Sequence, residues 1–427
     1  MTTIHNANIV EIRRDLHAYP ETGWTEFRTT ALVAAELDRL GYKLYLGSDA
    51  IAVDERLGVP SDDELAGALR RAQEADAPEE YLDRMNGVTG LIGEKRFGDG
   101  TGPTVGVRVD MDALDRTEAG DNTHRPAQEG FASRYPDKMH ACGHDGHTAI
   151  GIGIARTLEN DDEAEFNGTL KLFFQPAEEG GRGGLPMSRT PHLENIDYFF
   201  ALHLGLGNET GKIIAGYDRP LSNAKLDVEF SGEPAHAGKA PEKGKNALQA
   251  AATAIQNLYA IPRHSDGATR INVGKLTSLN AQNVIAERTE MRVEVRGETA
   301  ALNESMLDAA ERILIHSAAM HNVNLETELY GKSTTFVSDQ SAIDIVTKAA
   351  STIDNVDEIV EQETIGASED ASFLINRVQE LGGKCTYVGI GASNTAGHHT
   401  AYFDIDETAL QIGVDVLVQT ITRCAIE

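Results

Sequence analysis

The chain of 427 residues contains few cysteines and no long apolar run. Its three cysteines, Cys142, Cys385 and Cys424, are far apart and odd in number, which argues against a disulfide framework and favours a reducing compartment. No apolar stretch approaches the ~20 residues that a membrane-spanning helix requires. Residues 1–10 also lack the basic and then apolar pattern of a secretory signal. We therefore expect a cytoplasmic protein.

Basic residues are scarce relative to acidic ones. The chain has 38 lysines and arginines against 67 aspartates and glutamates, which gives a formal net charge of −29. Such a surface repels phosphate backbones and anionic membranes, so we expect no nucleic-acid partner and no membrane partner. An anionic substrate would need local basic or hydrogen-bonding groups in order to bind against this field.

What the sequence does contain is a series of short apolar strands separated by helical patterns. Amphipathic helices are predicted at 3–19 and 24–40, and an acidic helical insertion at about 60–86. This alternation indicates an α/β fold, with a mostly parallel mixed sheet and flanking helices. Ligands of such sheets bind beyond the carboxyl ends of the strands. The predicted strands are Thr104–Val109, Thr169–Phe174, Tyr198–His203 and Cys385–Ile390.

The pattern changes between residues 216 and 334. Ala224–Gly232 and Glu290–Gly297 alternate apolar and polar residues, as half-exposed strands do, and strong helical patterns accompany them. Paired strands with helices on one face predict a smaller α+β domain of the ferredoxin-like class. Because the chain is longer than one hydrophobic core usually supports, two domains are expected. We predict a larger domain made of 1–215 and 335–427, into which 216–334 is inserted.

Cys142 and His144 form a close pair of possible metal ligands. The glycine between them lets the backbone turn sharply enough for both side chains to face one point. Thiolate and imidazole both suit divalent transition metals, although an isolated cysteine is more often a small buried apolar residue. Asp145 and His147 follow at the start of a predicted helix, where a cap or a hydrogen-bonded support of a ligand is the more natural role.

Two adjacent carboxylates, Glu178 and Glu179, follow another predicted strand. Adjacent side chains diverge, so one carboxylate can bind a metal while the other activates water. The alternative is a solvated acidic loop, but the apolar run before the pair and the two glycines after it favour a rigid strand–loop junction. His203 lies at an apolar strand end, and either His398 or His399 is a further ligand that spacing alone does not choose. This donor set exceeds what a structural zinc site needs and predicts a hydrolytic metal centre.

The inserted domain contributes His236 and Asn283. His236 lies between small residues, in Pro234-Ala-His-Ala-Gly238, and residue type alone leaves two roles open. It is either a feature of a turn or a donor of a hydrogen bond to a developing oxyanion.

With these motifs in view, the chain resembles a large family of metallopeptidases and amidohydrolases, which includes aminoacylases, glutamate carboxypeptidases and plant auxin-conjugate amidohydrolases. The Cys-Gly-His form of the site points to the auxin-conjugate amidohydrolase branch. The acidic insertion, together with His124–Phe131 and Pro262–His264, resembles most one of the subunit types of aminobenzoyl-glutamate hydrolase. The motifs that carry the resemblance are Arg13–Glu21, Val107–Leu114, Met139–His147, Gln175–Gly181 and the segments around His236 and His399.

The resemblance implies two divalent metal ions, Mn²⁺ or Zn²⁺, and an inserted domain that acts as a lid and mediates dimerisation. By position in the motifs, Glu178 matches the general base and Asp112 the acidic residue that orients a ligand. His236 and Asn283 match residues that meet the substrate, the histidine often in the site of the partner copy. Asp110 stands where the broader family has a ligand histidine, which the cysteine branch replaces. The implied metal ligands are Cys142, His144, Glu179, His203 and His399.

These observations predict a metal-dependent amidohydrolase acting on a small N-acyl amino acid, with p-aminobenzoyl-glutamate or a similar conjugate as the first candidate. In this interpretation Glu178 is the base and His236 stabilises the oxyanion. One alternative is an aminoacylase or dipeptidase with another acyl specificity. The other is a subunit that needs a partner for activity, and the expected assembly is a homodimer or a heterodimer with a related subunit.

Overall fold

The computed structural model describes residues 4–160 and 166–426. Contacts within the chain divide it into two compact units. Unit 1 comprises Met1–Asp218, Phe336–Ile365 and Asp370–Glu427, and unit 2 comprises Arg219–Thr335 and Gly366–Glu369. The predicted boundaries were 216 and 334, and the predicted inserted domain did not include the short segment Gly366–Glu369, which packs with unit 2.

Unit 1 is built on a mixed sheet with the strand order β1-β2-β4-β3-β5-β13-β6-β11, and β12 also pairs with β6. The pairs β4–β3, β3–β5 and β5–β13 at its centre are parallel, whereas β1, β2 and the β13–β6 pair are antiparallel. This confirms the predicted mostly parallel mixed sheet. The strands are β1 Lys43–Leu46, β2 Leu91–Phe97, β3 Thr104–Asp110, β4 Gly168–Gln175, β5 Tyr198–Leu204, β6 Lys212–Asp218, β11 Glu358–Val360, β12 Glu363–Thr364 and β13 Lys384–Ile390.

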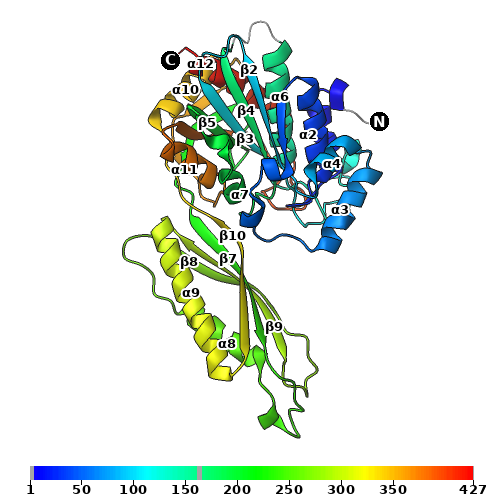
Figure 1. Ribbon diagram of the computed structural model, residues 1–427, viewed down its shortest axis with the longest axis vertical. Coiled ribbons are helices and arrows are strands. Elements are labelled where there is room, and N and C mark those ends of the chain that lie inside the picture. The colour runs from blue at the N-terminus through cyan, green and yellow to red at the C-terminus, as the bar shows by residue number, and fades with distance from the viewer. Residues whose placement is uncertain (1–3, 161–165, 427) are drawn as a thin grey trace. The chain divides into compact units, whose positions relative to one another are not determined.

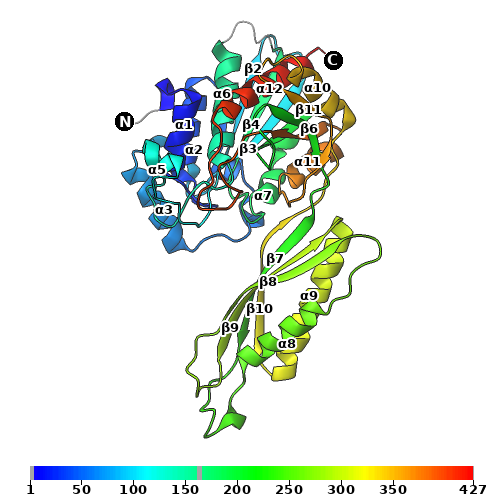
Figure 2. The same ribbon diagram turned by 180° about the vertical axis from the view of Figure 1, so that it is seen from behind.

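Helices cover both faces of this sheet (Figures 1 and 2). One apolar core joins the sheet to α1, α2, α6, α10 and α12, and a second joins the opposite face to α7 and α11. In the described part of the chain, no helix is both long enough and apolar enough to cross a membrane. The helices of unit 1 are α1 Ile9–Ala18, α2 Phe27–Arg39, α3 Asp62–Glu74, α4 Glu79–Met85, α5 Arg125–Glu129, α6 His144–Asn160, α7 Gly184–Ser188, α10 Gln340–Ala350, α11 Ser372–Glu380 and α12 Thr408–Cys424, with 3₁₀ turns η1 Ile4–Asn6, η2 Gly47–Asp49, η3 Val53–Glu55 and η4 Pro191–Leu193.

The first helix starts later than the predicted residue 3 because Asn8 caps it. The Asn8 side chain accepts the N–H groups of Val10 and Glu11, both at 3.0 Å, and the Glu11 side chain accepts the N–H of Asn8 at 2.8 Å. This reciprocal capping box satisfies N–H groups that have no partner within the helix. The second helix ends at Arg39, just before Gly41, whose φ of +77° is a left-handed conformation that glycine adopts readily at the end of a helix.

Unit 2 consists of a four-stranded antiparallel sheet with the order β10-β7-β9-β8 (Figure 1). Its elements follow one another as β-α-β-β-α-β, and both helices pack on one face of the sheet through an apolar core. This is the predicted ferredoxin-like topology. The elements are β7 Ser222–Ser231, η5 Pro241–Lys243, α8 Ala247–Tyr259, β8 Thr269–Thr277, β9 Arg288–Gly297, α9 Ala300–His321 and β10 Asn324–Ser333.

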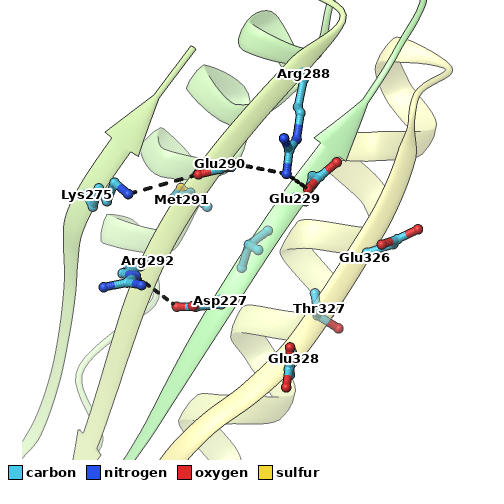
Figure 3. Close-up of a pocket in the computed structure, with 11 residues that line it drawn as sticks. Asp227, Glu229, Lys275, Arg288, Glu290, Met291, Arg292, Glu326, Thr327 and Glu328 are labelled. Atoms are coloured by element: carbon cyan, nitrogen blue, oxygen red, sulfur yellow. Dashed lines mark hydrogen bonds and ion pairs between the residues drawn. The ribbon is translucent and has the colours of Figure 1, made fainter. Parts of the chain in front are cut away.

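The other face of this sheet carries charged side chains that pair with one another (Figure 3). Arg288 lies 2.7 Å from Glu229 and 3.0 Å from Glu290, and Arg292 lies 3.2 Å from Asp227. The alternate residues of the same strands, such as Met291, point to the helices and are buried. Because successive side chains of a strand point to opposite faces, one face of this sheet is apolar and packs on the helices, and the other face is charged.

Candidate metal centre

The candidate site lies beyond the carboxyl ends of β3, β4 and β5. These strands are parallel neighbours in the sheet, and Asp110 at the end of β3 lies in register with Gln175 at the end of β4. Asp112, the Glu178–Glu179 pair and His203 therefore come to one edge of the sheet although up to about 90 residues separate them. The turn before α6 carries Cys142 to the same edge.

Cys142 occupies the middle of two overlapping groups of possible ligands. Its Sγ lies 3.6 Å from Nε2 of His203 and 3.3 Å from Nε2 of His399, and that Nε2 is 3.2 Å from Oε1 of Glu179. The groups are Cys142-His144-His203 and Cys142-Glu179-His399, and the donor atoms within each lie within 4.8 Å of one another. One thiol shared by two groups is an arrangement that suits two neighbouring cations.

The donor set also has the chemistry that a transition metal requires. Burial and the nearby carboxylate of Glu179 raise the pKa of the Cys142 thiol well above its ordinary value, so a cation must stabilise the thiolate. Both ring nitrogens of the buried His144 lack a hydrogen bond, with Nδ1 3.4 Å from the nearer oxygen of Asp112. Buried polar atoms normally have partners, and a ligated metal would supply one for Nε2, while Nδ1 faces Asp112. The residues present therefore fit a metal.

The tautomer of His203 follows from its surroundings. Its Nδ1 lies 2.7 Å from the carbonyl oxygen of Leu204, and only a protonated nitrogen can donate to a carbonyl. Nε2 therefore keeps its lone pair, and this is the nitrogen that faces Cys142. Such a hydrogen bond on the second ring nitrogen is how metal-binding histidines are commonly oriented.

The structure also distinguishes the two neighbouring histidines that spacing left open. His399 faces Cys142 and Glu179, and it adopts a left-handed backbone with φ of +60°, while its N–H donates to the carbonyl of Ala141 at 2.7 Å. His398 turns away to stack near Phe403, with ring centroids 4.8 Å apart, and burial lowers its pKa to about 4. The local backbone thus directs only His399 to the other donors.

Buried carboxylates hold the loop that carries Glu178 and Glu179. The two oxygens of Asp112 accept the backbone N–H groups of Glu178 and Glu179, each at 2.9 Å. Glu26 accepts the N–H of Ala177 at 2.7 Å, and Thr89 donates to its other oxygen at 2.8 Å. Burial, followed by the negative charge of Asp112, raises the pKa of Glu26 to about 8. Three consecutive N–H groups are therefore fixed by two carboxylates.

Asp145 and His147 lie outside the two groups that share Cys142, although His147 forms a further group of possible ligands with Asp110 and His144. His147 uses both nitrogens, because Nε2 accepts the N–H of Leu204 at 2.9 Å and Nδ1 donates to Asp110 at 2.5 Å. Asp145 accepts from Arg13 and from His17, both at 2.8 Å. These contacts agree with the supporting roles that the sequence analysis favoured.

His236 and Asn283 lie side by side in unit 2. An isolated bridge joins the His236 and Val284 positions, and the N–H of Ala237 donates to the Asn283 carbonyl at 2.9 Å. Nδ1 of His236 accepts the N–H groups of Gly238 and Lys239, at 3.2 and 3.1 Å. In the neutral ring Nε2 therefore carries the proton, and both His236 and Asn283 are exposed. This tautomer offers a hydrogen-bond donor to a ligand.

Known proteins are similar to this chain over nearly its whole length. The family model of peptidase family M20/M25/M40 matches residues 106–423. The chain belongs to this family. It is 42% identical over 410 residues to an indole-3-acetyl-aspartic acid hydrolase of Enterobacter agglomerans, and 41% identical over 410 residues to a subunit of the p-aminobenzoyl-glutamate hydrolase of Escherichia coli K12. Each comparison covers 96% of this chain and 94% of the relative.

A solved structure extends the likeness to three dimensions. The aminobenzoyl-glutamate utilization protein of Klebsiella pneumoniae superposes with a TM-score of 0.82 at 36% identity. The comparison covers 97% of this chain and 95% of that protein. The fold of this M20 family member is therefore that of its relatives throughout both units.

Glu26 is the residue of this M20 site that sequence reasoning missed. It stands at the start of α2, where an acidic residue is normally interpreted as a cap or as part of a solvated helix end. Its side chain makes no capping bond to the helix and instead reaches Ala177, 151 residues away. The only signal in the sequence was the position of Glu26, a few residues beyond the Arg13–Glu21 motif.

Proposed function

We propose that this chain is a metal-dependent amidohydrolase that cleaves the amide bond of N-acyl amino acids. The observation that carries the proposal is the pair of ligand groups that share Cys142, with Glu178 beside them. Membership of the M20 family and the close relatives that hydrolyse acyl-amino acid conjugates support it.

In this proposal Cys142, His144, Glu179, His203 and His399 would hold two divalent ions. A sulfur, nitrogen and oxygen donor set suits zinc or manganese. When bound, such ions acidify water and polarise a carbonyl oxygen. Asp112 faces Nδ1 of His144 and holds the Glu178–Glu179 loop, so it positions one residue of each group.

The proton transfers are assigned to Glu178. Its Oε2 lies 3.9 Å from Nε2 of His144, so it borders the ligand groups, and its side chain is partly exposed. Glu178 takes a proton from the attacking water and returns it to the leaving amine, as a general base that becomes a general acid. His236 donates its Nε2–H to the developing oxyanion, and Asn283 binds the substrate beside it.

The relatives suggest which amide is cleaved. Their names contain aspartate in one case and glutamate in the other, each joined to an aromatic acyl group. We therefore propose p-aminobenzoyl-glutamate or a similar aroyl or acyl conjugate as the substrate. An aminoacylase or dipeptidase activity with another acyl group is the alternative.

The proposal includes an assembly and a compartment. Unit 2 serves as the lid and dimerisation domain of a homodimer. One relative is named as a single subunit of its hydrolase, which supports a heterodimer as the second possibility. The three cysteines form no disulfide with one another, which supports a reducing cytoplasm.

The decisive experiment is amide hydrolysis by the purified, metal-stripped chain before and after Mn²⁺ or Zn²⁺ is added. The substrates are p-aminobenzoyl-glutamate and several N-acyl amino acids. Metal-dependent cleavage of the aminobenzoyl compound is expected. Cleavage of only the other substrates would retain the mechanism and reject the acyl group, and activity that appears only with a second protein chain would support the partner-dependent alternative.

A further inference from the structure

The guanidinium of Arg56, on a loop linked to the loop of Glu179, has no acidic partner among the described residues. Around the site, Arg108 pairs with Asp110 at 2.9 Å, and Lys138 pairs with Asp115 at 2.7 Å. Arg56, in contrast, makes no ion pair with any carboxylate of the described residues, and its Nε is buried without a hydrogen-bond partner. An arginine that is partly buried and pairs with none of the described carboxylates requires an explanation.

Arg56 lies on a loop that is fastened to the loop of Glu179. The indole N–H of Trp24 donates to the carbonyl of Leu57 at 2.8 Å. Arg182 donates from Nη1 to the carbonyl of Gly58 at 3.1 Å and from Nε to the carbonyl of Glu179 at 3.0 Å. A single side chain therefore links the Arg56 loop to the loop that carries the candidate ligand and base. The preceding turn η3 is held to α7 because the N–H of Ala52 donates to the carbonyl of Pro186 at 3.1 Å.

The guanidinium of Arg56 is held in place although its Nε–H has no hydrogen-bond acceptor. Its Cζ lies 5.5 Å from the ring centroid of Trp24, which is only 1% exposed and so forms a rigid support. Stacking of this kind fixes the plane of the guanidinium and leaves its edge donors available. Burial alone lowers the pKa of Arg56, because no nearby carboxylate offsets the loss of water. A partly desolvated, unpaired guanidinium binds a carboxylate strongly, because it can donate two parallel hydrogen bonds to it.

We propose that Arg56 binds the side-chain carboxylate of the acidic amino acid in an N-acyl glutamate or N-acyl aspartate. This inference rests on the proposed function and names the feature of the substrate that is selected. A local cation is needed because the net charge of −29 repels a substrate that carries two carboxylates. Arg56 supplies that cation on a rigid support beside the loop of Glu178 and Glu179.

The test compares p-aminobenzoyl-glutamate with p-aminobenzoyl-glutamine, which have nearly the same shape and differ in the charge of the side chain. R56Q is expected to lower kcat/KM for the glutamate compound by about tenfold to a hundredfold, the effect of losing a charge-assisted hydrogen bond. It should change the value for the glutamine compound much less. R56K, which keeps a positive charge, should retain part of the preference. The matched control is R134Q, because Arg134 also lies over an aromatic ring, that of Tyr19 at 4.6 Å.

Equal losses on both substrates, or no loss on either, would overturn the assignment. Thermal unfolding of each variant shows whether it is folded. If the metal-loaded wild type cleaves neither compound, the proposed hydrolysis fails, and binding of the same two compounds by titration calorimetry then decides the role of Arg56. Binding of the glutamate compound that R56Q weakens selectively supports the inference, whereas binding that is absent or unaffected by R56Q rejects it.

Discussion

At the scale of single residues, Glu178 carries the most direct prediction of the proposed chemistry. Glutamine has the shape of glutamate but cannot take a proton from water, and Glu178 is not among the five proposed ligands. E178Q should therefore keep the metal content of the wild type and lose kcat by at least about a hundredfold, the usual contribution of a general base. Steady-state kinetics and elemental analysis of the same sample test this. Wild-type turnover by E178Q would show that the base lies elsewhere.

Glu26 allows a second prediction, since it fixes the backbone of the same loop from the interior. E26A removes the acceptor of the Ala177 N–H, and the metal affinity should fall by about tenfold to a hundredfold, as for other supports of metal ligands. E21A is the matched control. Glu21 is also a buried carboxylate and accepts two backbone N–H groups at 2.8 Å, but these belong to Arg28 and Thr29 of α2.

Both variants should unfold at a lower temperature. E26A leaves the buried Ala177 N–H without an acceptor, and E21A does the same to the Arg28 and Thr29 N–H groups. Only E26A should weaken metal binding when both are titrated with Zn²⁺ or Mn²⁺ well below their unfolding temperatures. An equal effect of E21A would mean that Glu26 acts on the stability of the fold and not on the loop. E26Q, which can still accept the Ala177 N–H, should recover most of the affinity.

At the scale of elements, the loop between β4 and α7 is folded back on itself. The N–H of Gly183 donates to the carbonyl of Ala177 at 2.8 Å, and a Cβ on Gly183 would lie 1.7 Å from the carbonyl oxygen of Pro176. G183A should therefore destabilise the protein by at least about 1–3 kcal/mol, the usual result of overpacking, and should reduce turnover because Glu178 moves with the loop. Chemical denaturation and kinetics measure the two effects. G120A should be nearly neutral, because nothing lies within 4 Å of that Cβ.

The parts of the fold that the sequence predicted are those in which neighbouring residues decide the structure. The core strands β3, β4, β5 and β13 are short apolar runs that alternate with helical patterns, and this combination predicts buried strands of one sheet. In contrast, β2 lies antiparallel between β1 and β4, and nothing in Leu91–Phe97 indicates this neighbour.

The same limit applies to the candidate site. Residue types and their place next to predicted strands and turns were enough to select Cys142, the Glu178–Glu179 pair and His203 as candidates, and the resemblance assigned Glu179 as the ligand of the pair. Spacing left His398 and His399 open, and the family resemblance preferred His399. The tertiary hydrogen bond to Ala141 and the left-handed backbone that direct His399 to the other donors are not encoded by local spacing. Glu26 and Arg56 were missed for a similar reason, because their partners lie in distant segments.

At the scale of the whole molecule, the net charge of −29 makes stability depend on salt. Acidic side chains on the surface repel one another, and added ions screen that repulsion over about 10 Å at 0.1 M and over shorter distances as salt rises. The unfolding temperature should therefore increase by at least a few degrees between low salt and about 1 M KCl. Sucrose of equal osmolality is the control for effects unrelated to charge, and an unfolding temperature independent of KCl would contradict the argument.

The last prediction concerns the assembly, and it follows from the separation of His236 and Glu178 into different units. If His236 serves the site of a partner copy, a mixed dimer of E178Q and H236A contains one site with Glu178 from one chain and His236 from the other. Two inactive preparations should then regain about a quarter of wild-type activity after the chains exchange, since half of the dimers are mixed and each has one intact site. If both residues serve the same chain's site, every site in the mixture lacks one of them and no activity returns. Confirmation of exchange with differently tagged chains makes either result interpretable, and it decides whether one copy of this enzyme forms a complete active site.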